Sequence, residues 1–397
     1  MIKFDDRIHE IQELLAKQEV SGWLLYDYKK SNPLAHAFLQ IPSGQMVTRR
    51  FFYWIPRKGI PVKIVPMIEP SILDHLPGNK LVYCGWQELE RLLCMFVEEG
   101  AKIAMEYSPY NALPNVSKVD AGTIEFLRQH GAEIVSSANL LQRYTSVWTP
   151  AQLEAHLEAA EVLDNVAAET WAYIQKALLT QTPLTEYQVQ QYILERISAH
   201  GCIMEASPIC AVNQNSANPH YAPSESHSAP INSGDFILID LWCKKNIPDA
   251  VYADITRVGV AAPQPTARQK KIFEIVKEAR DEATRFIKEC HAMGRAVQGW
   301  QVDQAARDVI IQAGFGEYFI HRTGHNISEE VHGAGTNLDN LETHDYRELL
   351  PGTCCSIEPG IYLPQDFGVR LEYDIYLGFK GECHVTGGVQ NEVVCLG

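Results

Sequence analysis

The sequence has no uninterrupted apolar run of the roughly 20 residues that a membrane-spanning helix needs. Residues 1–7 already carry charge, and the segment that follows lacks the apolar core of a signal peptide. Cysteine is also sparse: the 397 residues include 10 cysteines, and none forms a Cys-x-x-Cys pair. We therefore expect a cytoplasmic protein with reduced thiols and no membrane association.

Positive charge is scarce as well. The chain has 34 lysines and arginines against 49 aspartates and glutamates, which gives a formal net charge of −15. Such an acidic chain is poorly suited to bind nucleic-acid phosphate over a broad surface. Residues 1–148 contain no Gly-x-Gly-x-x-Gly motif and no phosphate loop. We therefore expect no nucleic-acid partner, whereas part of the negative charge is available to bind cations.

The chain is predicted to form two domains. Its first part alternates helical and strand patterns, and the apolar runs at 51–55 and 61–65 predict a hairpin. In Thr149-Pro150-Ala151-Gln152, a capping residue precedes a proline at the first helical position and a capping-box glutamine. This motif predicts a long helix that ends near Leu179. The predicted domains are an α/β domain at 1–148 and a second domain at 149–397.

The second domain has an internal repeat of helix, helix and strand pair. Capping boxes at Thr149, Thr185 and Thr266 start three of the four predicted helices, and the fourth covers 303–312. The predicted strands are 236–240 and 251–257 in the first copy, and 353–363 and 369–377 in the second. The two copies share an order of elements rather than similar residues, so the repeat is structural.

Four acidic residues occur at matching positions in the two copies of this repeat. Asp240 and Asp254 are 14 residues apart and are expected to face each other across a hairpin, with Cβ atoms about 5 Å apart. Glu358 and Glu372 repeat the spacing 118 residues later (358 − 240 and 372 − 254), with Gln365 at their midpoint. Like charges in apolar strands raise each other's pKa unless a cation compensates, and two divalent ions would neutralise the four carboxylates. Alternatively, each acid has a structural role instead of binding metal: it ends a strand or forms an ion pair with a nearby arginine, Arg257 or Arg370.

Histidines supply a second signal. His321, His325 and His332 cluster with Gly324 and Gly333, which allow tight turns that direct side chains toward a site. Imidazole binds zinc, cobalt or manganese and can carry protons near neutral pH. Isolated histidines such as His156 are interpreted as core or surface groups, and His156→Ala is expected to have little effect on activity.

In chain order, the motifs are Asp240, Asp254-Ile-Thr-Arg257, Gly324-His325, His332-Gly333, Ile357-Glu358-Pro359-Gly360 and Arg370-Leu371-Glu372. This ordered set resembles the pita-bread metallopeptidases, the family of Xaa-Pro aminopeptidase, prolidase and methionine aminopeptidase, with creatinase as a relative that acts without metal. The resemblance covers about residues 150–397, and the preceding segment resembles the creatinase-type N-terminal domain. It implies an α/β creatinase-like N-terminal domain followed by an α+β pita-bread catalytic domain with a pseudo-twofold repeat.

The resemblance implies a dinuclear metal site. Asp240 would bind one ion, His325 and Glu358 would bind the other, and Asp254 and Glu372 would bridge the two. Two divalent ions are expected, with manganese preferred over cobalt or zinc. A water or hydroxide held between them would be the nucleophile, because paired metals activate water at neutral pH.

Further side chains receive roles from the same resemblance. Glu358 would also move protons from the water toward the leaving amine. His220 and His332 would donate hydrogen bonds to the substrate or to the developing oxyanion, and His321 would line the substrate pocket. Arg370 would hold a bridging carboxylate in place without touching the metal.

The sequence therefore predicts a metallopeptidase that cleaves before a proline at the second position of a peptide. Xaa-Pro aminopeptidase and Xaa-Pro dipeptidase are not separated by the sequence, and the resemblance implies a homodimer. Asn326-Ile-Ser328 stands where the family often has glycine, which bears on pocket shape and on the preference for proline. The hairpin between Asp240 and Asp254 is slightly longer than in typical members, which bears on the rim of the pocket and leaves the ligands intact. The alternatives are a hydrolase or lyase acting on a small non-peptide substrate, and a non-catalytic binding module.

Overall fold

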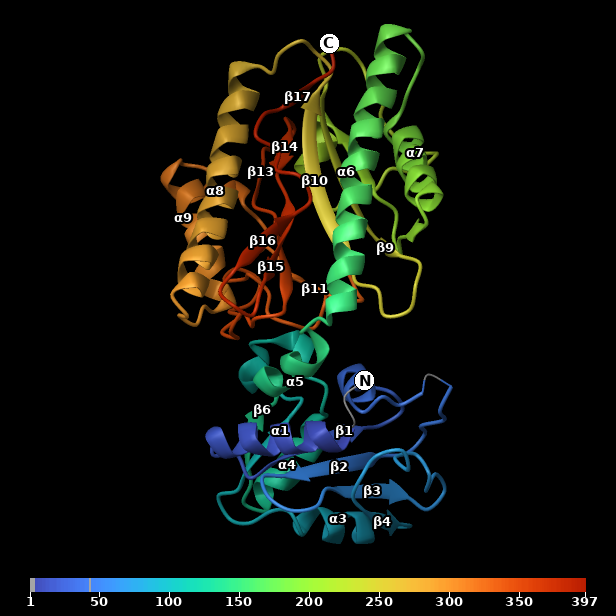
Figure 1. Cartoon of the computed structure of the whole chain (residues 1–397), viewed down its shortest axis with the longest axis vertical. Coiled ribbons are helices and arrows are strands. Elements are labelled where there is room, and N and C mark those ends of the chain that lie inside the picture. Colours follow the sequence, from blue (N-terminus) through green and yellow to red (C-terminus); the bar gives the residue numbers. More distant parts are fainter. Residues whose placement is uncertain (1–3, 43) are drawn as a thin grey trace. The chain divides into compact units, whose positions relative to one another are not determined.

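The computed structural model describes residues 4–42 and 44–397 of the chain. These residues form two compact units that divide between Thr145 and Ser146, each with its own hydrophobic clusters (Figure 1). The sequence-based boundary lay slightly later, between 148 and 149. Within the described ranges, no helix is long and apolar enough to cross a bilayer.

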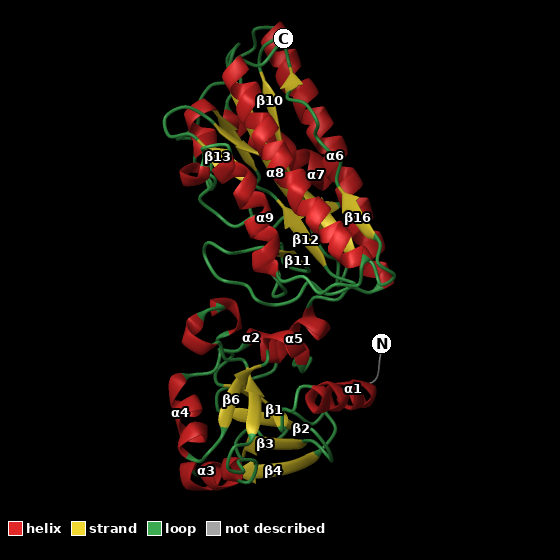
Figure 2. Ribbon diagram, turned by 90° about the vertical axis from the view of Figure 1, so that its left-hand side faces the viewer, coloured by secondary structure: helices red, strands yellow, loops and turns green. Residues whose placement is uncertain are grey.

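The N-terminal unit is a mixed six-stranded sheet with helices on both faces (Figure 2). Residues Phe51 and Tyr53 pack in the cluster formed with α1, α2 and α5, whereas Phe52 and Trp54 pack in the cluster formed with α3 and α4. This alternation is the period of two that a strand buried on both faces requires. The strand order is β4-β3-β2-β1-β5-β6. The elements are α1 (Phe4–Lys17), β1 (Gly22–Asp27), α2 (Pro33–Phe38), β2 (Phe51–Pro56), β3 (Val62–Pro66), β4 (Asn79–Tyr83), α3 (Trp86–Cys94), β5 (Lys102–Met105), α4 (Ala121–Gln129), β6 (Glu133–Ser136) and α5 (Ala138–Thr145), with short 3₁₀ turns at Pro109–Asn111 and Pro114–Val116.

The C-terminal unit begins with the predicted helices. Thr149, Thr185 and Thr266 each form the expected capping box with the glutamine three residues later. These capping boxes begin α6, α7 and α8 at the predicted residues, because each satisfies backbone N–H groups that the first turn leaves free. The helices are α6 (Pro150–Leu179), α7 (Glu186–Ala199), α8 (Ala267–Ala292) and α9 (Gly299–Gln312), with 3₁₀ turns η3 (Asn213–Ala217) and η4 (Gly316–Tyr318).

The strands of this unit form three sheets, which α6 and α8 flank in Figure 1. One sheet has the order β17-β10-β9-β7, with β8 also paired to β9; the others are β11-β12-β15-β16 and the hairpin β13-β14. The strands are β7 (Cys202–Ile203), β8 (Ile209–Val212), β9 (Phe236–Lys245), β10 (Ala253–Val260), β11 (Asn326–Ile327), β12 (Cys354–Ile357), β13 (Gly360–Tyr362), β14 (Gly368–Arg370), β15 (Tyr373–Leu377), β16 (Cys383–Thr386) and β17 (Val394–Cys395).

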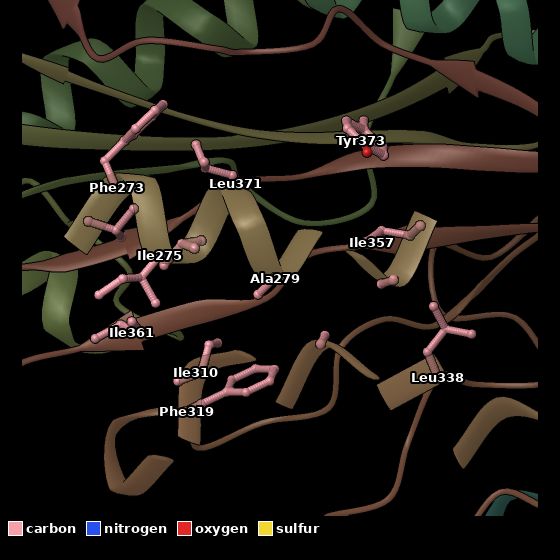
Figure 3. Close-up of a cluster of buried hydrophobic side chains, with 14 of the residues drawn as sticks. Phe273, Ile275, Ala279, Ile310, Phe319, Leu338, Ile357, Ile361, Leu371 and Tyr373 are labelled. Atoms are coloured by element: carbon pink, nitrogen blue, oxygen red, sulfur yellow. The ribbon is translucent and has the colours of Figure 1, made fainter. Parts of the chain in front are cut away.

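Strand β9 separates two hydrophobic clusters. Its residues Ile237 and Ile239 pack in the cluster that contains α6 and α7, whereas Phe236 and Leu238 pack in the cluster that contains α8 and α9. Figure 3 shows part of the second cluster, where residues of α8 and α9 lie against Ile357, Ile361 and neighbouring strand residues. Asp240 continues the face of Phe236 and Leu238, so this acid follows directly on an apolar face of the sheet.

The second strand pair differs from the prediction at two points. The predicted strand 353–363 is broken into β12 and β13 at Glu358 and Pro359, and the predicted strand 369–377 is broken into β14 and β15 at Leu371 and Glu372. Pro359 has no backbone N–H to donate to a neighbouring strand, which accounts for the first break. Both breaks therefore fall at a predicted metal-binding glutamate.

The registers explain how the acids are placed. Asp240 pairs with Thr256, and Asp254 pairs with Trp242, so the expectation that the two aspartates directly oppose each other is wrong by two residues. The turn is not centred on Ile247, because residues 246–252 form a longer connection. An even offset keeps both carboxylates on one face, as diagonal neighbours. In the second pair, Gly360 opposes Arg370 and Tyr362 opposes Gly368, so this hairpin is centred on Gln365 as predicted.

His156 is a core histidine. It is fully buried; its Nδ1 lies 2.7 Å from the Tyr252 carbonyl oxygen, and its Nε2 lies 2.6 Å from Thr386 Oγ1. We expect His156→Ala to lower the free energy of unfolding by about 2–4 kcal/mol, because it opens a cavity and leaves buried partners unsatisfied. Activity per folded molecule should stay close to that of the unmodified protein, because His156 does not line the pocket described below. Chemical denaturation and kcat below the melting temperature check both points; unchanged stability would contradict the first.

Candidate metal centre

All nine side chains singled out from the sequence line one pocket of the C-terminal unit, with a volume of about 240 Å³. Asp240 comes from β9 and Asp254 from β10, whereas the two glutamates stand at the strand breaks. The lining also includes Ile209, Pro219, Trp242, Arg322, Val331 and Glu342, which the sequence did not suggest. The nine predicted residues in the lining are Asp240, Asp254, His325, Glu358, Glu372, His220, His321, His332 and Arg370.

Four of these side chains converge closely. Asp254, His325 and Glu372 are buried, and each presents one possible ligand atom within 4.8 Å of the others. His325 Nε2 lies 3.8 Å from Asp254 Oδ2 and 3.3 Å from Glu358 Oε1. An imidazole nitrogen among carboxylate oxygens is a donor set typical of manganese, cobalt or zinc sites.

Backbone pairing sets the position of His325. Ser356 N donates to the His325 carbonyl at 2.9 Å, and Glu358 N donates to the Thr323 carbonyl at 2.7 Å. Gly324 lies between these two contacts, and a Cβ there would stand 2.0 Å from the Ser356 carbonyl oxygen. The glycine therefore permits the close approach that brings His325 beside Glu358.

Arg370 pairs with Asp240. Its Nη2 donates to Asp240 Oδ2 in a short contact, and its Nε donates to Thr256 Oγ1 at 2.9 Å. The Thr256 hydroxyl in turn donates to Glu372 Oε2 at 2.6 Å and lies 3.2 Å from Asp240 Oδ1. Arg370 was expected to hold a bridging carboxylate, Asp254 or Glu372; instead it reaches Asp240 directly and Glu372 through Thr256. The reason is that Arg370 lies on β14, and from there its guanidinium reaches Asp240 on β9.

The local electrostatics disfavour ionised carboxylates. Burial, followed by repulsion from Glu372 and Asp240, raises the pKa of Asp254 well above its usual range. Burial and the neighbouring acids Glu358 and Asp240 do the same to the pKa of Glu372. Burial lowers the pKa of His325 well below its usual value. These directions describe a site in which burial keeps the histidine neutral and the acids need a cation to ionise.

The fit of a divalent cation to this site rests on an unsatisfied atom. Asp254 Oδ1 is buried and has no hydrogen-bond partner among the described residues. Asp254 N donates to Asp374 Oδ2 at 2.9 Å, so this aspartate is anchored through its backbone while its carboxylate faces the other acids. A buried carboxylate oxygen without a donor is costly, and a metal ion would satisfy it. The residues present therefore fit divalent metal, which would be held by Asp240, Asp254, His325, Glu358 and Glu372.

We expect Glu358→Gln to stabilise the metal-free protein at alkaline pH. Burial raises the pKa of Glu358 from 4.5 to about 7. A carboxyl group with a raised folded-state pKa stabilises the fold below its unfolded pKa, and this stabilisation is lost as pH rises through about 7. The variant carries no charge there, so its melting temperature should exceed that of the unmodified protein by several degrees at pH 8 and match it near pH 4.

The test is to remove metal from both proteins with a chelator and to measure their melting temperatures by thermal unfolding across this pH range. Manganese provides the control, since a bound ion should reverse the order of the two melting temperatures. A constant difference between the two metal-free proteins from pH 4 to pH 8 would contradict the expectation.

The pocket wall contains a hydrogen-bonded chain that the sequence did not indicate. Arg370 Nη1 donates to the Tyr362 hydroxyl at 3.1 Å, and that hydroxyl lies 2.7 Å from His321 Nε2. His321 Nδ1 lies 2.7 Å from the Arg322 carbonyl oxygen, so Nδ1 carries the proton and Nε2 accepts from Tyr362. Burial, assisted by Arg370, lowers the pKa of His321 to about 3. No spacing rule could have found Tyr362, because the strand break at Glu358 and Pro359 separates it from β12.

Asn326 accounts for the departure from glycine noted in the sequence. Its Nδ2 donates to the Cys354 carbonyl, and its Oδ1 accepts from Gly335 N, both at 3.0 Å. A Cβ on Gly333 would lie 2.3 Å from Asn326 Oδ1, so the asparagine side chain occupies space beside a glycine. Asn326 is thus buried beneath the turn that follows His332, and it supports the pocket wall from behind.

The fold and the pocket together define a pita-bread protein with a creatinase-type N-terminal domain. A model of metallopeptidase family M24 matches residues 154–378. The chain belongs to metallopeptidase family M24, which confirms the family and the fold class predicted from the sequence.

Individual relatives agree with this assignment. A putative Xaa-Pro aminopeptidase of Mycoplasma pneumoniae is 30% identical over 224 residues, 56% of this chain and 57% of the relative. An Xaa-Pro dipeptidase of Lactobacillus helveticus is 33% identical over 194 residues, 48% of each chain. The matches thus span about half the length of these curated relatives. The crystal structure of dipeptidase PepE from Mycobacterium ulcerans superposes with a TM-score of 0.70 at 21% identity, covering 99% of this chain and 98% of that one.

Proposed function

We propose that the protein hydrolyses the bond between the first residue of a peptide and a proline at the second position, as an Xaa-Pro aminopeptidase or dipeptidase. The observation that carries the proposal is the convergence of four carboxylates and His325 in one buried pocket. Membership of family M24 and the printed names of relatives, Xaa-Pro aminopeptidase and Xaa-Pro dipeptidase, support the substrate class. An intact set of metal-binding side chains disfavours a non-catalytic binding module.

The metal-binding roles are proposed residue by residue. Asp240 would hold one ion, His325 and Glu358 would hold the other, and Asp254 and Glu372 would serve both, with manganese preferred over cobalt or zinc. When bound, two divalent ions supply an activated water and polarise the scissile carbonyl. Arg370 keeps the Asp240 carboxylate oriented, and Thr256 keeps the Glu372 carboxylate oriented, through the hydrogen bonds described above.

Proton transfer is assigned to Glu358. Its Oε1 accepts a hydrogen bond from Ser356 Oγ at 3.2 Å, which fixes the carboxylate beside His325. A carboxylate in this position can take a proton from the attacking water and release it to the leaving nitrogen of proline. His220 and His332, at the pocket lining, donate hydrogen bonds to the carbonyl oxygen as it becomes an oxyanion.

The proposal is tested with peptides and metals together. The purified protein should release the first residue from Xaa-Pro dipeptides or longer Xaa-Pro peptides when manganese, cobalt or zinc is supplied. Matched Xaa-Ala peptides should be cleaved far more slowly. Activity on only one length of peptide would separate dipeptidase from aminopeptidase. No turnover of any Xaa-Pro peptide with any of the three metals would refute the function and favour a non-peptide substrate.

Two further properties remain proposals. The sparse cysteines and the resemblance suggest a cytoplasmic enzyme, and the resemblance implies a homodimer. Light scattering of the purified chain determines the oligomeric state independently of activity.

A further inference from the structure

His220 reaches the pocket from a long connection. The chain between β8 and β9 covers residues 213–235 and contains η3 as its regular structure. Long connections within compact domains hold a fixed shape only where specific contacts anchor them. The backbone N of His220 donates to Asn218 Oδ1 at 3.1 Å, which is a bond inside the connection itself. The position of the His220 imidazole therefore depends on what fastens the connection to the rest of the unit.

Glu186 provides such a fastening. It is the first residue of α7, and its side chain is fully buried. Its Oε1 accepts from the backbone N of Val212 at 2.7 Å and from Asn215 Nδ2 at 2.9 Å. Its Oε2 accepts from the Tyr221 hydroxyl at 2.6 Å and from the backbone N of Ala229 at 2.7 Å. Four neutral donors thus satisfy one buried carboxylate, and the N-terminus of α7 favours its negative charge.

The four donors are spread along the connection. Val212 is the last residue of β8, just before the connection; Asn215 lies in η3, Tyr221 follows His220 directly, and Ala229 lies near the end of the connection. A single carboxylate therefore accepts hydrogen bonds from residues that are up to 17 positions apart in the sequence (229 − 212). Closing a connection in this way removes conformations that would carry His220 away from the pocket.

The other neighbour of His220 is also held. Arg370 Nη1 lies 3.4 Å from the Pro219 carbonyl oxygen, and Gly368 N donates to Ser216 Oγ at 2.8 Å. Pro219 thereby contacts Arg370, the arginine that pairs with Asp240, while Tyr221 donates a hydrogen bond to Glu186. His220 is thus placed between two anchored residues, one facing the acids and one facing α7.

We infer that Glu186 is a positioning residue that holds His220 at the pocket through the hydroxyl of Tyr221. The inference rests on the proposed function of His220 in binding the reacting carbonyl. Glu186 itself does not line the pocket; it acts by restricting where the imidazole can stand.

The sharpest test is a double-mutant cycle with Tyr221→Phe and His220→Ala. Tyr221→Phe deletes one hydroxyl beside His220 and should lower kcat about tenfold on an Xaa-Pro dipeptide, with metal content and melting temperature nearly unchanged. His220→Ala should lower kcat by about 10²-fold. In the His220→Ala background, Tyr221→Phe should have no further effect, because its influence passes through the imidazole.

Ser228→Ala is the matched control. The Ser228 hydroxyl accepts from Tyr187 N at 2.8 Å, so this change removes one hydrogen bond between the same connection and α7 without touching the neighbours of His220. It should leave kcat unchanged. Glu186→Gln, which places an amide N–H among donors, should lower kcat more than Tyr221→Phe, and Glu186→Asp should recover part of the loss if it folds.

Amide hydrogen exchange gives a readout that does not need activity. The amide of Tyr221, which donates to the Asn218 carbonyl at 3.1 Å, should exchange faster in Tyr221→Phe than in the unmodified protein or in Ser228→Ala. Unchanged kcat in Tyr221→Phe, or a Tyr221→Phe effect that persists in full without His220, would overturn the inference. An unmodified protein inactive on all Xaa-Pro peptides would instead count against the proposed function, and the exchange comparison would still decide whether the hydroxyl holds the segment around His220.

Discussion

Asp254→Ala and Glu372→Ala are each expected to lower kcat/KM on an Xaa-Pro dipeptide by about 10³-fold or more. Asp254 and Glu372 lie within 4.8 Å of one another together with His325, and each comes from a different half of the structural repeat. Removing either carboxylate takes away a side chain proposed to serve both ions. The same changes should reduce the number of ions that the purified protein retains, which elemental analysis measures.

A matched control is available on the surface. Glu161 is an exposed acid of α6, away from the pocket, so Glu161→Ala removes the same kind of charge without altering the site. It should retain full activity and metal content. The variants also lose a carboxylate whose pKa is raised by burial, so the metal-free forms of Asp254→Ala and Glu372→Ala should not be less stable than the unmodified metal-free protein at neutral pH. Activity retained in either variant at a normal metal content would remove that residue from the proposed centre.

Complete removal of metal should have an equally large effect. We expect dialysis against a chelator to reduce hydrolysis of Xaa-Pro peptides to the background rate, because the proposed nucleophile is a water that only bound metal would activate. Stepwise addition of manganese should restore activity, and the amount needed for full recovery gives the number of ions. Saturation at two per chain would agree with the proposed centre.

The control for this experiment is chelator saturated with manganese beforehand, which should leave activity unchanged. Full activity at one ion per chain would contradict the dinuclear arrangement while leaving the metal requirement intact. Full activity with no retained metal would contradict both.

Much of the fold could be predicted from short-range signals. Thr149, Thr185 and Thr266 mark helix starts because capping depends on a residue and its neighbour three positions on, which a sequence displays directly. The hairpin at 51–55 and 61–65 is equally local, and β2 and β3 confirm it. The register around Asp240 was not predictable in this way, because it depends on how many residues the turn uses, and the turn has no strong signature.

The residues of the candidate site also fall into two groups: those that the sequence indicates and those that only the tertiary structure shows. Acids inside apolar strands and histidines clustered with glycines are unusual enough to attract attention, and all nine site residues chosen from the sequence, Arg370 included, line the pocket. Thr256 and Tyr362 went unnoticed because both residue types are ordinary in strands and their importance lies in partners far along the chain. Glu186 gave no signal for a different reason: as an acid in the first turn of a helix it is explained locally, and only the tertiary structure shows which groups it accepts from.

The division of the acids between two halves of the repeat has a consequence during synthesis of the protein. Asp240 and Asp254 leave the ribosome long before Glu358 and Glu372, so a nascent chain has only half of the group that would bind metal. The proposed site is therefore complete only after the second half of the repeat has been made, and the hydrophobic clusters around β9 help to bring the two halves together. Without a cation, the acids that meet there are held together at the cost of raised pKa values. A metal that binds only the complete site would, by mass action, shift the equilibrium toward the folded chain.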